Sequence, residues 1–313
     1  MRIAIMGTGG LGGYFGAKLA FANMDVVFIA RGELLRSISQ NGIKVHSPKG
    51  DFAIKSIQAT DNPNLIGPVD LILLCVKTYD LDGALQSLLP LIGPHTTVIP
   101  LLNGFEHIAK MKAVLGDSHV LGGISMTFAR KGEPGVVHHL ADLDHYQIEF
   151  GEWEGTISQR CQQVQEVWEQ ADVKGIAVSN IAERMWWKLA GICGAGVFAV
   201  ARGDKSKVWI PETQALFHGA ISEVVAIARS QQILLDDALP DKFVNVIVNA
   251  PATYKPSLLT DLEQGRRLEI ASTNGFISRL GKDLNIATAV NDFIYACLKP
   301  HMNGSVLANK PAS

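Results

Sequence analysis

The sequence predicts an α/β domain followed by an all-α domain. Over residues 1–179 of the 313-residue chain, short apolar segments alternate with segments of helical spacing, which is typical of a doubly wound sheet. From residue 180 onward the strand signal disappears, and segments of helical spacing are separated by breaks that contain glycine or proline. We therefore expect an α/β domain over 1–179, a helical domain over 180–302 and a loose tail over 303–313.

The expected elements of the first domain follow from their apolar spacing. A hairpin over 42–57 turns near Ser47 to Gly50, and the segment 69–76 is apolar on both faces, as a central parallel strand must be. The other expected strands lie at 2–6, 25–30, 97–101, 120–128, 135–139, 146–150 and 176–178. The expected helices of this domain lie at 10–23, 79–89, 105–115 and 158–171. Those of the second domain lie at 181–200, 212–232, 238–249, 257–265, 267–284 and 287–299.

A glycine-rich turn follows the first strand directly. It has the form G-x-G-x-x-G and consists of Gly7, Thr8, Gly9, Gly10, Leu11 and Gly12. In a dinucleotide-binding turn the first glycine permits the tight turn, the second lets the backbone approach a pyrophosphate, and the third lets the helix pack closely on the sheet. The N–H groups of that helix then face the phosphates. The strand before it and the helix after it favour a dinucleotide site over a plain glycine-rich connection.

The end of the second strand indicates which dinucleotide is bound. Arg31 lies about twenty residues after Gly12, where an NAD-binding unit carries an acidic residue. A carboxylate there would bind the ribose 2′-hydroxyl, whereas a guanidinium pairs with a 2′-phosphate. NADPH or NADP is therefore expected. The alternative is that Arg31 is an ordinary solvated residue and Glu33 takes the ribose.

Composition limits the classes of partner and the cellular compartment that we expect. With 28 basic and 30 acidic side chains the chain carries no large field, so we expect neither nucleic acid nor a membrane as partner. The apolar segments are too short to span a bilayer, and the first strand begins at residue 2, which leaves no room for a signal peptide. We expect a cytoplasmic protein with scattered, reduced cysteines.

One cluster of metal-ligating residue types occurs between residues 138 and 145. It consists of His138, His139, Asp142, Asp144 and His145. Their spacing matches no recognised ligand pattern, so we interpret the cluster as a polar loop and expect no metal.

Two residues of the second domain are candidates for acid–base chemistry. A nicotinamide enzyme needs a group that delivers a proton as hydride arrives. Lys188 follows two tryptophans near the domain junction, where partial burial would lower its pKa, although a lysine extending from a core helix gives the same pattern. Glu269 lies among apolar residues on an expected helix and needs a partner, which is either Lys188 or one of Arg266 and Arg267.

Six motifs of this chain occur in the order and spacing of one known family. They are Gly7 to Gly16, Arg31, Cys75 to Thr78, Leu102 to Gly104, Trp187 to Ala190, and Glu269 to Phe276. In these motifs, over nearly its whole length, the chain resembles the ketopantoate reductases. The resemblance implies a Rossmann-type domain followed by a helical domain, NADPH as cofactor, and reduction of 2-dehydropantoate to pantoate for pantothenate biosynthesis, with the substrate in the interdomain cleft.

The resemblance also implies roles for individual residues. Lys188 matches the general acid and Glu269 the carboxylate that assists it. Asn103 matches a residue beside the nicotinamide and the reacting end of the substrate, Ser257 a hydroxyl that binds the substrate carboxylate, and Lys77 a lysine on the cofactor side of the cleft.

The chain departs from the family pattern on the helix that carries Lys188. The family has asparagines four and eight residues after its catalytic lysine, and here these positions are Ile192 and Gly196. The segment Asp204 to Trp209 also replaces the usual Asn-Gly-Glu-Leu. Such a pocket would bind a polar acid less well and tolerate a bulkier apolar group better, and restoring both asparagines should then raise activity on ketopantoate.

Three functional hypotheses remain from the sequence. The first is an NADPH-dependent reductase of a branched 2-oxo acid, with ketopantoate the first substrate to test. The second is a related dehydrogenase for a bulkier or more apolar 2-oxo acid, and the third is a non-catalytic NADPH sensor, which would not need Lys188 or Glu269. The apolar faces of the expected helices suggest a homodimer.

Overall fold

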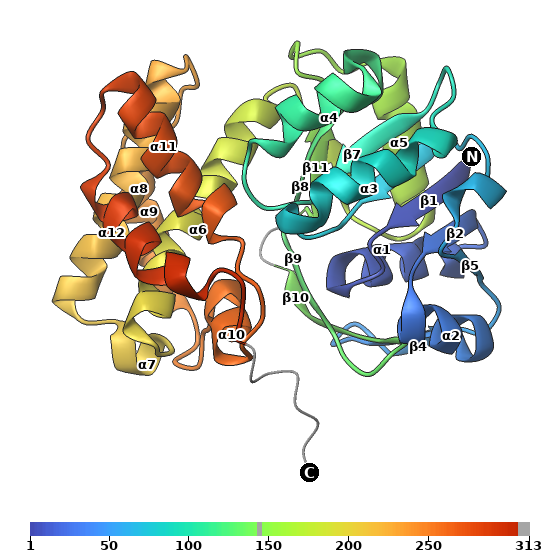
Figure 1. Cartoon of the computed structure of the whole chain (residues 1–313), viewed down its shortest axis with the longest axis horizontal. Coiled ribbons are helices and arrows are strands. Elements are labelled where there is room, and N and C mark those ends of the chain that lie inside the picture. Colours follow the sequence, from blue (N-terminus) through green and yellow to red (C-terminus); the bar gives the residue numbers. More distant parts are fainter. Residues whose placement is uncertain (143–145, 306–313) are drawn as a thin grey trace. The chain divides into compact units, whose positions relative to one another are not determined.

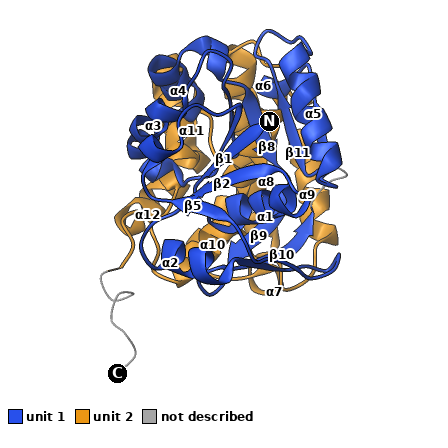
Figure 2. Cartoon of the chain, turned by 90° about the vertical axis from the view of Figure 1, so that its right-hand side faces the viewer, with its two compact units in different colours: residues 1–102, 107–182 blue, residues 103–106, 183–313 orange. Residues whose placement is uncertain are grey.

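The computed structural model describes residues 1–142 and 146–305. The chain divides into two compact units, coloured separately in Figure 2. Unit 1 comprises residues 1–102 and 107–182, and unit 2 comprises 103–106 and 183–313. The short segment 103–106 therefore leaves the α/β unit and belongs to the helical one, which the sequence pattern did not indicate.

A parallel five-stranded sheet forms the centre of unit 1. Its strand order is β5-β2-β1-β6-β7, which corresponds to the first five positions of the classic dinucleotide-binding order 3-2-1-4-5-6. The strands are β1 (Arg2–Met6), β2 (Asp25–Ile29), β5 (Gln58–Thr60), β6 (Leu71–Leu74) and β7 (Thr97–Pro100). All four residues of β6 and of β7 are buried, because helices cover both faces of a parallel sheet. The register pairs Met6 with both Ile29 and Leu74, so three strands end together beside the glycine turn.

Two smaller sheets complete unit 1. One has the order β4-β3-β10-β9 and consists of β3 (Ile43–His46), β4 (Phe52–Ile54), β9 (Thr127–Lys131) and β10 (Val136–Asp142). The other has the order β12-β11-β8 and consists of β8 (Gly122–Ser125), β11 (Ile148–Gly151) and β12 (Gly175–Ala177). A parallel bridge between Val98 and Val120 links β7 to the segment that leads into β8. The α/β class predicted from the sequence is confirmed.

The helices of unit 1 are α1 (Gly10–Phe21), α2 (Gly32–Asn41), α3 (Leu81–Leu88), α4 (His107–Leu115) and α5 (Gln159–Gln170), visible in Figure 1. The sequence did not predict α2. Its apolar residues occupy one narrow face, with Ile38 buried against the core and most of the other residues exposed, so its periodic signal is short. Ser158 caps α5 by accepting a hydrogen bond from the backbone N–H of Cys161.

Unit 2 is helical throughout its described residues, as expected. The helices are α6 (Ile181–Ala201), which begins in unit 1, then α7 (Lys205–Val208), α8 (Pro211–Ser230), α9 (Leu239–Asn249), α10 (Ser257–Glu263), α11 (Asn274–Leu284) and α12 (Ala289–Leu298). Figure 1 shows α6, α8, α9, α11 and α12 gathered into one bundle. The bundle buries an apolar core that includes Trp186, Phe198 and Phe217.

One expectation for unit 2 was wrong. The single helix expected over 267–284 is a 3₁₀ turn over Ile270–Ser272 followed by α11, and Glu269 precedes the turn. Glu269 is therefore not on a helix. The break follows from Thr273, whose backbone angles, φ −115° and ψ −103°, are incompatible with a continuous helix. For the expected tail, residues 306–313 lie outside the described residues.

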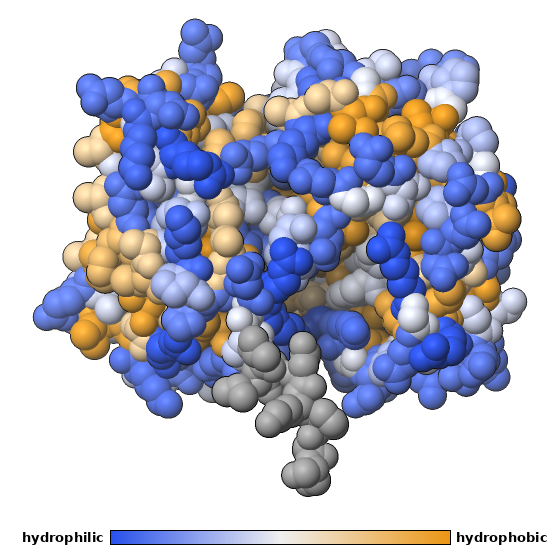
Figure 3. Space-filling model, in the orientation of Figure 1, coloured by the Kyte–Doolittle hydropathy of each residue, from blue (hydrophilic) through white to orange (hydrophobic). Residues whose placement is uncertain are grey.

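No helix in the described ranges is both long enough and apolar enough to cross a membrane. Figure 3 shows hydrophilic residues over much of the visible face, interspersed with hydrophobic ones. The exposed hydrophobic side chains of unit 2 include Ile210, Leu234, Val246, Val248 and Phe293.

Candidate active site

The glycine turn has the geometry that a dinucleotide pyrophosphate requires. Gly7 has a φ of +97°, a backbone conformation that favours glycine. A Cβ on Gly12 would lie 2.2 Å from the carbonyl oxygen of Gly7, so the helix packs against the turn at a distance that only glycine allows. A Cβ on Gly9 would meet nothing within 4 Å, so the space beside its backbone is open.

The N-terminus of α1 is available to an anion. Within the first turn of α1 there is no acidic residue, and the N-cap Gly9 provides no side-chain cap for the backbone N–H groups. These N–H groups and the positive end of the helix dipole suit a phosphate. The open space beside Gly9 and the uncapped helix therefore fit a pyrophosphate.

The remaining predicted cofactor residues occupy different places in unit 1. The Thr8 hydroxyl donates a hydrogen bond to the carbonyl oxygen of Ile29, 3.2 Å away, and so ties the turn to the end of β2. Leu11 is partly buried against the apolar core. Arg31 is exposed at the N-cap of α2, immediately after β2, where a ribose substituent is expected. Lys77 lies after β6 at the same carboxyl edge of the sheet.

Lys188, Glu269 and Asn103 form one electrostatic group within unit 2. Lys188 is partly exposed on α6, yet burial lowers the pKa of its ammonium group to about 8, while the carboxylate of Glu269 acts in the opposite direction. Glu269 is only 7% exposed, and its Oε2 accepts a hydrogen bond from Nδ2 of Asn103 at 3.3 Å. A lysine with a pKa near neutrality can donate a proton at physiological pH.

Gly104 determines how Asn103 reaches Glu269. Its φ is +89°, and a Cβ there would lie 2.5 Å from the carbonyl oxygen of Ser272. The segment is also held by Phe105, whose ring lies 5.0 Å from that of Trp186 and 6.3 Å from that of Phe276. No separate role for Gly104 was predicted from the sequence, although an Asn-Gly pair is a signal for a sharp turn.

Two of the three partners considered for Glu269 have described interactions. Arg266 forms an ion pair with Asp261 at 2.8 Å. For Lys188, the charge of the Glu269 carboxylate raises the pKa and so opposes the larger effect of burial. Ser257 is exposed at the first position of α10, and none of the contacts described here joins it to Lys188, Asn103 or Glu269.

The two positions that depart from the family pattern differ from each other. Ile192 is half-buried one helical turn after Lys188, on the same side of α6. Gly196 is buried, and a Cβ there would lie 2.7 Å from Cγ2 of Ile294 and 3.1 Å from Oδ1 of Asn274. Since an asparagine at position 196 has no room without rearrangement, the expected rescue by two asparagines needs revision, and Ile192 is the position to change.

The polar residues between 138 and 142 belong to a hydrogen-bonded network. The carboxylate of Asp142 accepts hydrogen bonds from Thr127 at 2.8 Å and from Gln147 at 3.0 Å, and it lies 3.1 Å from Nε2 of His139. In the described ranges no three residues of the types His, Cys, Asp and Glu form a metal-binding group. Asp144 and His145 lie outside the described residues.

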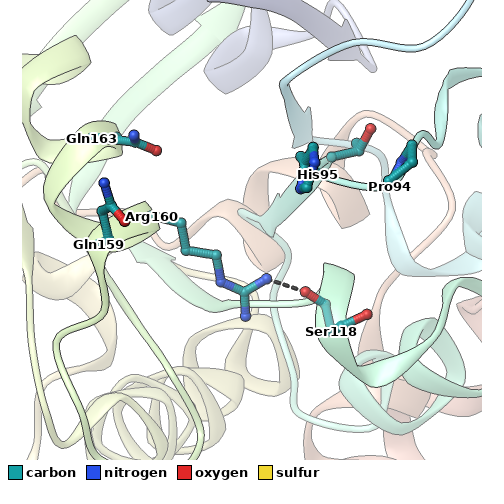
Figure 4. A pocket seen from close by; sticks show the side chains of 7 residues that line it. Pro94, His95, Ser118, Gln159, Arg160 and Gln163 are labelled. Carbon is teal, nitrogen blue, oxygen red and sulfur yellow. Dashed lines mark hydrogen bonds between the residues drawn. The ribbon is translucent and has the colours of Figure 1, made fainter.

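A polar pocket of about 440 Å³ lies elsewhere in unit 1 and shares no lining residue with the glycine turn. Figure 4 shows Arg160 of α5 extending toward Ser118, whose carbonyl oxygen accepts its hydrogen bond. The same guanidinium donates two hydrogen bonds to Glu152, at 2.7 and 2.5 Å, and this pairing lowers the pKa of the Glu152 carboxyl. The charge of Arg160 is thus already neutralised.

Comparisons with known proteins identify the family of the chain. The family model described as ketopantoate reductase PanE/ApbA matches residues 3–155, and the model of its C-terminal part matches residues 180–302. A 2-dehydropantoate 2-reductase of Mesorhizobium japonicum is 26% identical, with 96% of this chain and 97% of the relative covered.

Solved structures of related proteins have the same fold. The crystal structure of a 2-dehydropantoate 2-reductase from Geobacter metallireducens has a TM-score of 0.89 and 30% identity, covering 96% of this chain and 99% of that one. A ternary structure of D-mandelate dehydrogenase with NADH and anilino(oxo)acetate shares the fold, with a TM-score of 0.88, 22% identity, and coverage of 96% and 98%. This chain belongs to the ketopantoate reductase family and is an NAD(P)-dependent oxidoreductase that acts on a CH–OH group.

Proposed function

We propose that the chain catalyses the NADPH-dependent reduction of a branched 2-oxo acid to the 2-hydroxy acid, with 2-dehydropantoate as the first substrate to test. The observation that carries this proposal is the group formed by Lys188, Glu269 and Asn103, in which burial lowers the pKa of the lysine to about 8. A poised cation beside a buried carboxylate suits the protonation of a developing alkoxide.

In this proposal each residue has a separate task. NADPH, when bound, would supply the hydride for the carbonyl carbon. The ammonium group of Lys188 donates its proton to the carbonyl oxygen, which becomes the hydroxyl. Glu269 stabilises the protonated lysine before transfer and orients it, and Asn103 donates to Glu269 and fixes that carboxylate. Ser257 is assigned to the substrate carboxylate.

NADPH is proposed over NADH because of Arg31. Its guanidinium extends from the N-cap of α2, directly after β2, where the fork of donors suits a phosphate on the ribose. Glu33 lies in the first turn of the same helix and is the residue that would favour NADH. The Gly7, Gly9 and Gly12 turn and Lys77 are assigned to the common part of the cofactor.

The test is to measure NADPH oxidation with purified enzyme across a panel of 2-oxo acids. We expect turnover of 2-dehydropantoate or a branched analogue, and a reduction of kcat by roughly 10²- to 10⁴-fold in Lys188→Ala. Lys242→Ala, an exposed lysine of α9, serves as the control and should retain full activity. Identical rates for the native enzyme and Lys188→Ala would refute the catalytic assignment, and binding of NADPH without turnover of any acid would favour a sensor.

A second substrate class is favoured by Ile192. An apolar side chain stands one turn after Lys188 where the family has an amide, which favours a bulkier or aromatic 2-oxo acid such as phenylglyoxylate. The D-mandelate dehydrogenase that shares the fold acts on an aryl-substituted acid. Ile192→Asn should raise the ratio of kcat/KM for 2-dehydropantoate to that for phenylglyoxylate. An unchanged ratio would exclude Ile192 as the residue that sets specificity.

We also propose that the enzyme is a homodimer formed through unit 2. Val246 and Val248 of α9 are 57% and 49% exposed, and Leu234 just before this helix is 74% exposed. Multi-angle light scattering of the full chain should give twice the mass of 33.8 kDa. A mass of one chain at micromolar concentration would refute the proposal.

A further inference from the structure

The second sheet of unit 1 lies directly over the helix that follows the glycine turn. A Cβ on Gly10 would lie 2.3 Å from the carbonyl oxygen of Ala129 in β9, and a Cβ on Gly13 would lie 2.8 Å from Cγ2 of Val137 in β10. The first turn of α1 and these two strands are therefore in close contact. Side chains that leave β9 on this face extend beside the predicted cofactor site.

The register of β9 and β10 determines which cation of β9 lies on that face. Lys131 pairs with Val137, and Arg130 pairs with His138. Directly opposed residues of an antiparallel pair share one face of the sheet, and neighbours along a strand alternate. Val137 faces α1, so Lys131 leaves the strand on the α1 side. Arg130 leaves it on the other side with His138, whose ring stacks 5.4 Å from that of His46.

A small cavity places Lys131 with the nucleotide turn. Thr8 and Gly9 of the turn form one part of its lining, and Leu34 and Ile38 of α2 form another. Lys131 completes the lining together with Ile43 and residues 135–137. Lys131 pairs through its main chain with β10, while its side chain is exposed and forms no hydrogen bond or ion pair with the described residues. Its ammonium group is thus free to meet a ligand between the turn and α2.

The two charged side chains at the start of α2 leave no net positive charge for binding a phosphate. Arg31 and Glu33 lie two residues apart, so a phosphate bound here would meet one positive and one negative side chain. A phosphate monoester carries roughly 1.5 to 2 negative charges at neutral pH. Lys131, which lines the same cavity as Leu34 and Ile38 of α2, would restore a net positive charge at this place.

We propose that Lys131 is a specificity-determining residue that binds the 2′-phosphate of NADP together with Arg31. This inference rests on the proposed preference for NADPH. It assigns cofactor selection to two elements far apart in the sequence, the end of β2 and the end of β9.

The test compares cofactor affinities of the full chain with those of two variants. Dissociation constants for NADPH and NADH are measured by nicotinamide fluorescence, and those for adenosine 2′,5′-bisphosphate by calorimetry. We expect Lys131→Ala to weaken NADPH and the bisphosphate about tenfold and to leave NADH within about twofold, since one charge-assisted contact accounts for a factor of this size. Arg130→Ala is the matched control, from the neighbouring residue on the opposite face, and should change none of the three.

The outcomes separate this inference from the proposed function. A native enzyme that prefers NADPH, with affinities unchanged in Lys131→Ala, would refute the role of Lys131 alone. Equal weakening of NADPH and NADH would also refute it, because the lysine would then contact the part that both cofactors share. A native enzyme that binds NADH as tightly as NADPH would overturn both proposals. Melting temperatures of the variants confirm that the folded state is retained.

Discussion

The glycine turn of unit 1 and the Lys188 group of unit 2 are built in contrasting ways. The turn spans six consecutive residues and uses backbone N–H groups and the absence of side chains. The Lys188 group joins residues that lie between 81 and 166 positions apart, and it uses buried charge. A site formed by backbone groups loses function when a side chain adds atoms to it. A site formed by charged side chains loses function when a charge is removed or the pH changes.

The largest predicted effect tests the backbone site with two alanine substitutions. Gly9→Ala places a Cβ in open space, so the protein should keep its stability but lose roughly tenfold to hundredfold in NADPH affinity, because the methyl group occupies the approach of the pyrophosphate. Gly12→Ala places a Cβ 2.2 Å from a backbone oxygen and should lower the free energy of unfolding by about 1–3 kcal/mol. Denaturant unfolding and fluorescence titration measure both. A Gly9→Ala variant that binds NADPH with native affinity would contradict the view that the turn binds the cofactor through its backbone.

The next prediction concerns the pH dependence of the charged site. Lys188 donates a proton only when it is protonated, so kcat/KM should be full below its pKa and fall as the pH rises through about 8. Glu269 raises this pKa, and therefore Glu269→Gln should move the basic limb to lower pH and reduce kcat/KM by about tenfold. The test is to measure kcat/KM of the native enzyme and of Glu269→Gln from about pH 6 to 10. If the basic limb of the pH profile has the same midpoint in Glu269→Gln as in the native enzyme, Glu269 does not influence the pKa of Lys188.

A smaller and opposite shift is expected from Asn103→Asp. The new carboxylate would lie about 3.3 Å from Glu269 and add negative charge to the group, which favours the protonated lysine. The basic limb should therefore move to higher pH. Asn103→Ala separates the effect of this charge from the loss of the hydrogen bond, and it should leave the limb near its native position. Movement of the Asp variant toward lower pH would contradict the arrangement.

The smallest predicted effect concerns the core around Gly196, about two turns after Lys188 on α6. Gly196→Ala places a Cβ 2.7 Å from Ile294 and should lower the melting temperature by about 2–5 °C. Gly83→Ala in α3 is the control, since its Cβ would meet nothing within 4 Å, and it should leave stability unchanged or slightly higher. Calorimetry of both variants gives the comparison. An unchanged melting temperature for Gly196→Ala would show that position 196 can accommodate the family's asparagine.

Local hydrophobic spacing was sufficient to predict much of the fold. It failed where contacts between distant segments determine the structure. The strands β1, β2, β6 and β7 were predictable because each is a short apolar run buried on both faces. The hairpin of β3 and β4 was predicted as well, but its pairing with β10 was not, because pairing between residues about 90 positions apart leaves no mark on local periodicity. The interruption of the predicted helix at Thr273 was likewise not predicted, and it lies where Gly104 approaches the carbonyl oxygen of Ser272, a residue distant in sequence.

The sequence by itself determined the α/β and helical division, the dinucleotide turn and the identity of the candidate residues Arg31, Lys188 and Glu269. These depend on spacing over a few residues, which is preserved in the one-dimensional chain. Only the tertiary structure brings the charge of Glu269 to bear on the pKa of Lys188, packs Gly196 against Ile294 and Asn274, and places Lys131 in the lining of a cavity with Thr8 and Gly9. Burial, charge coupling and strand register arise from contacts between distant segments, and those contacts exist only in the folded chain.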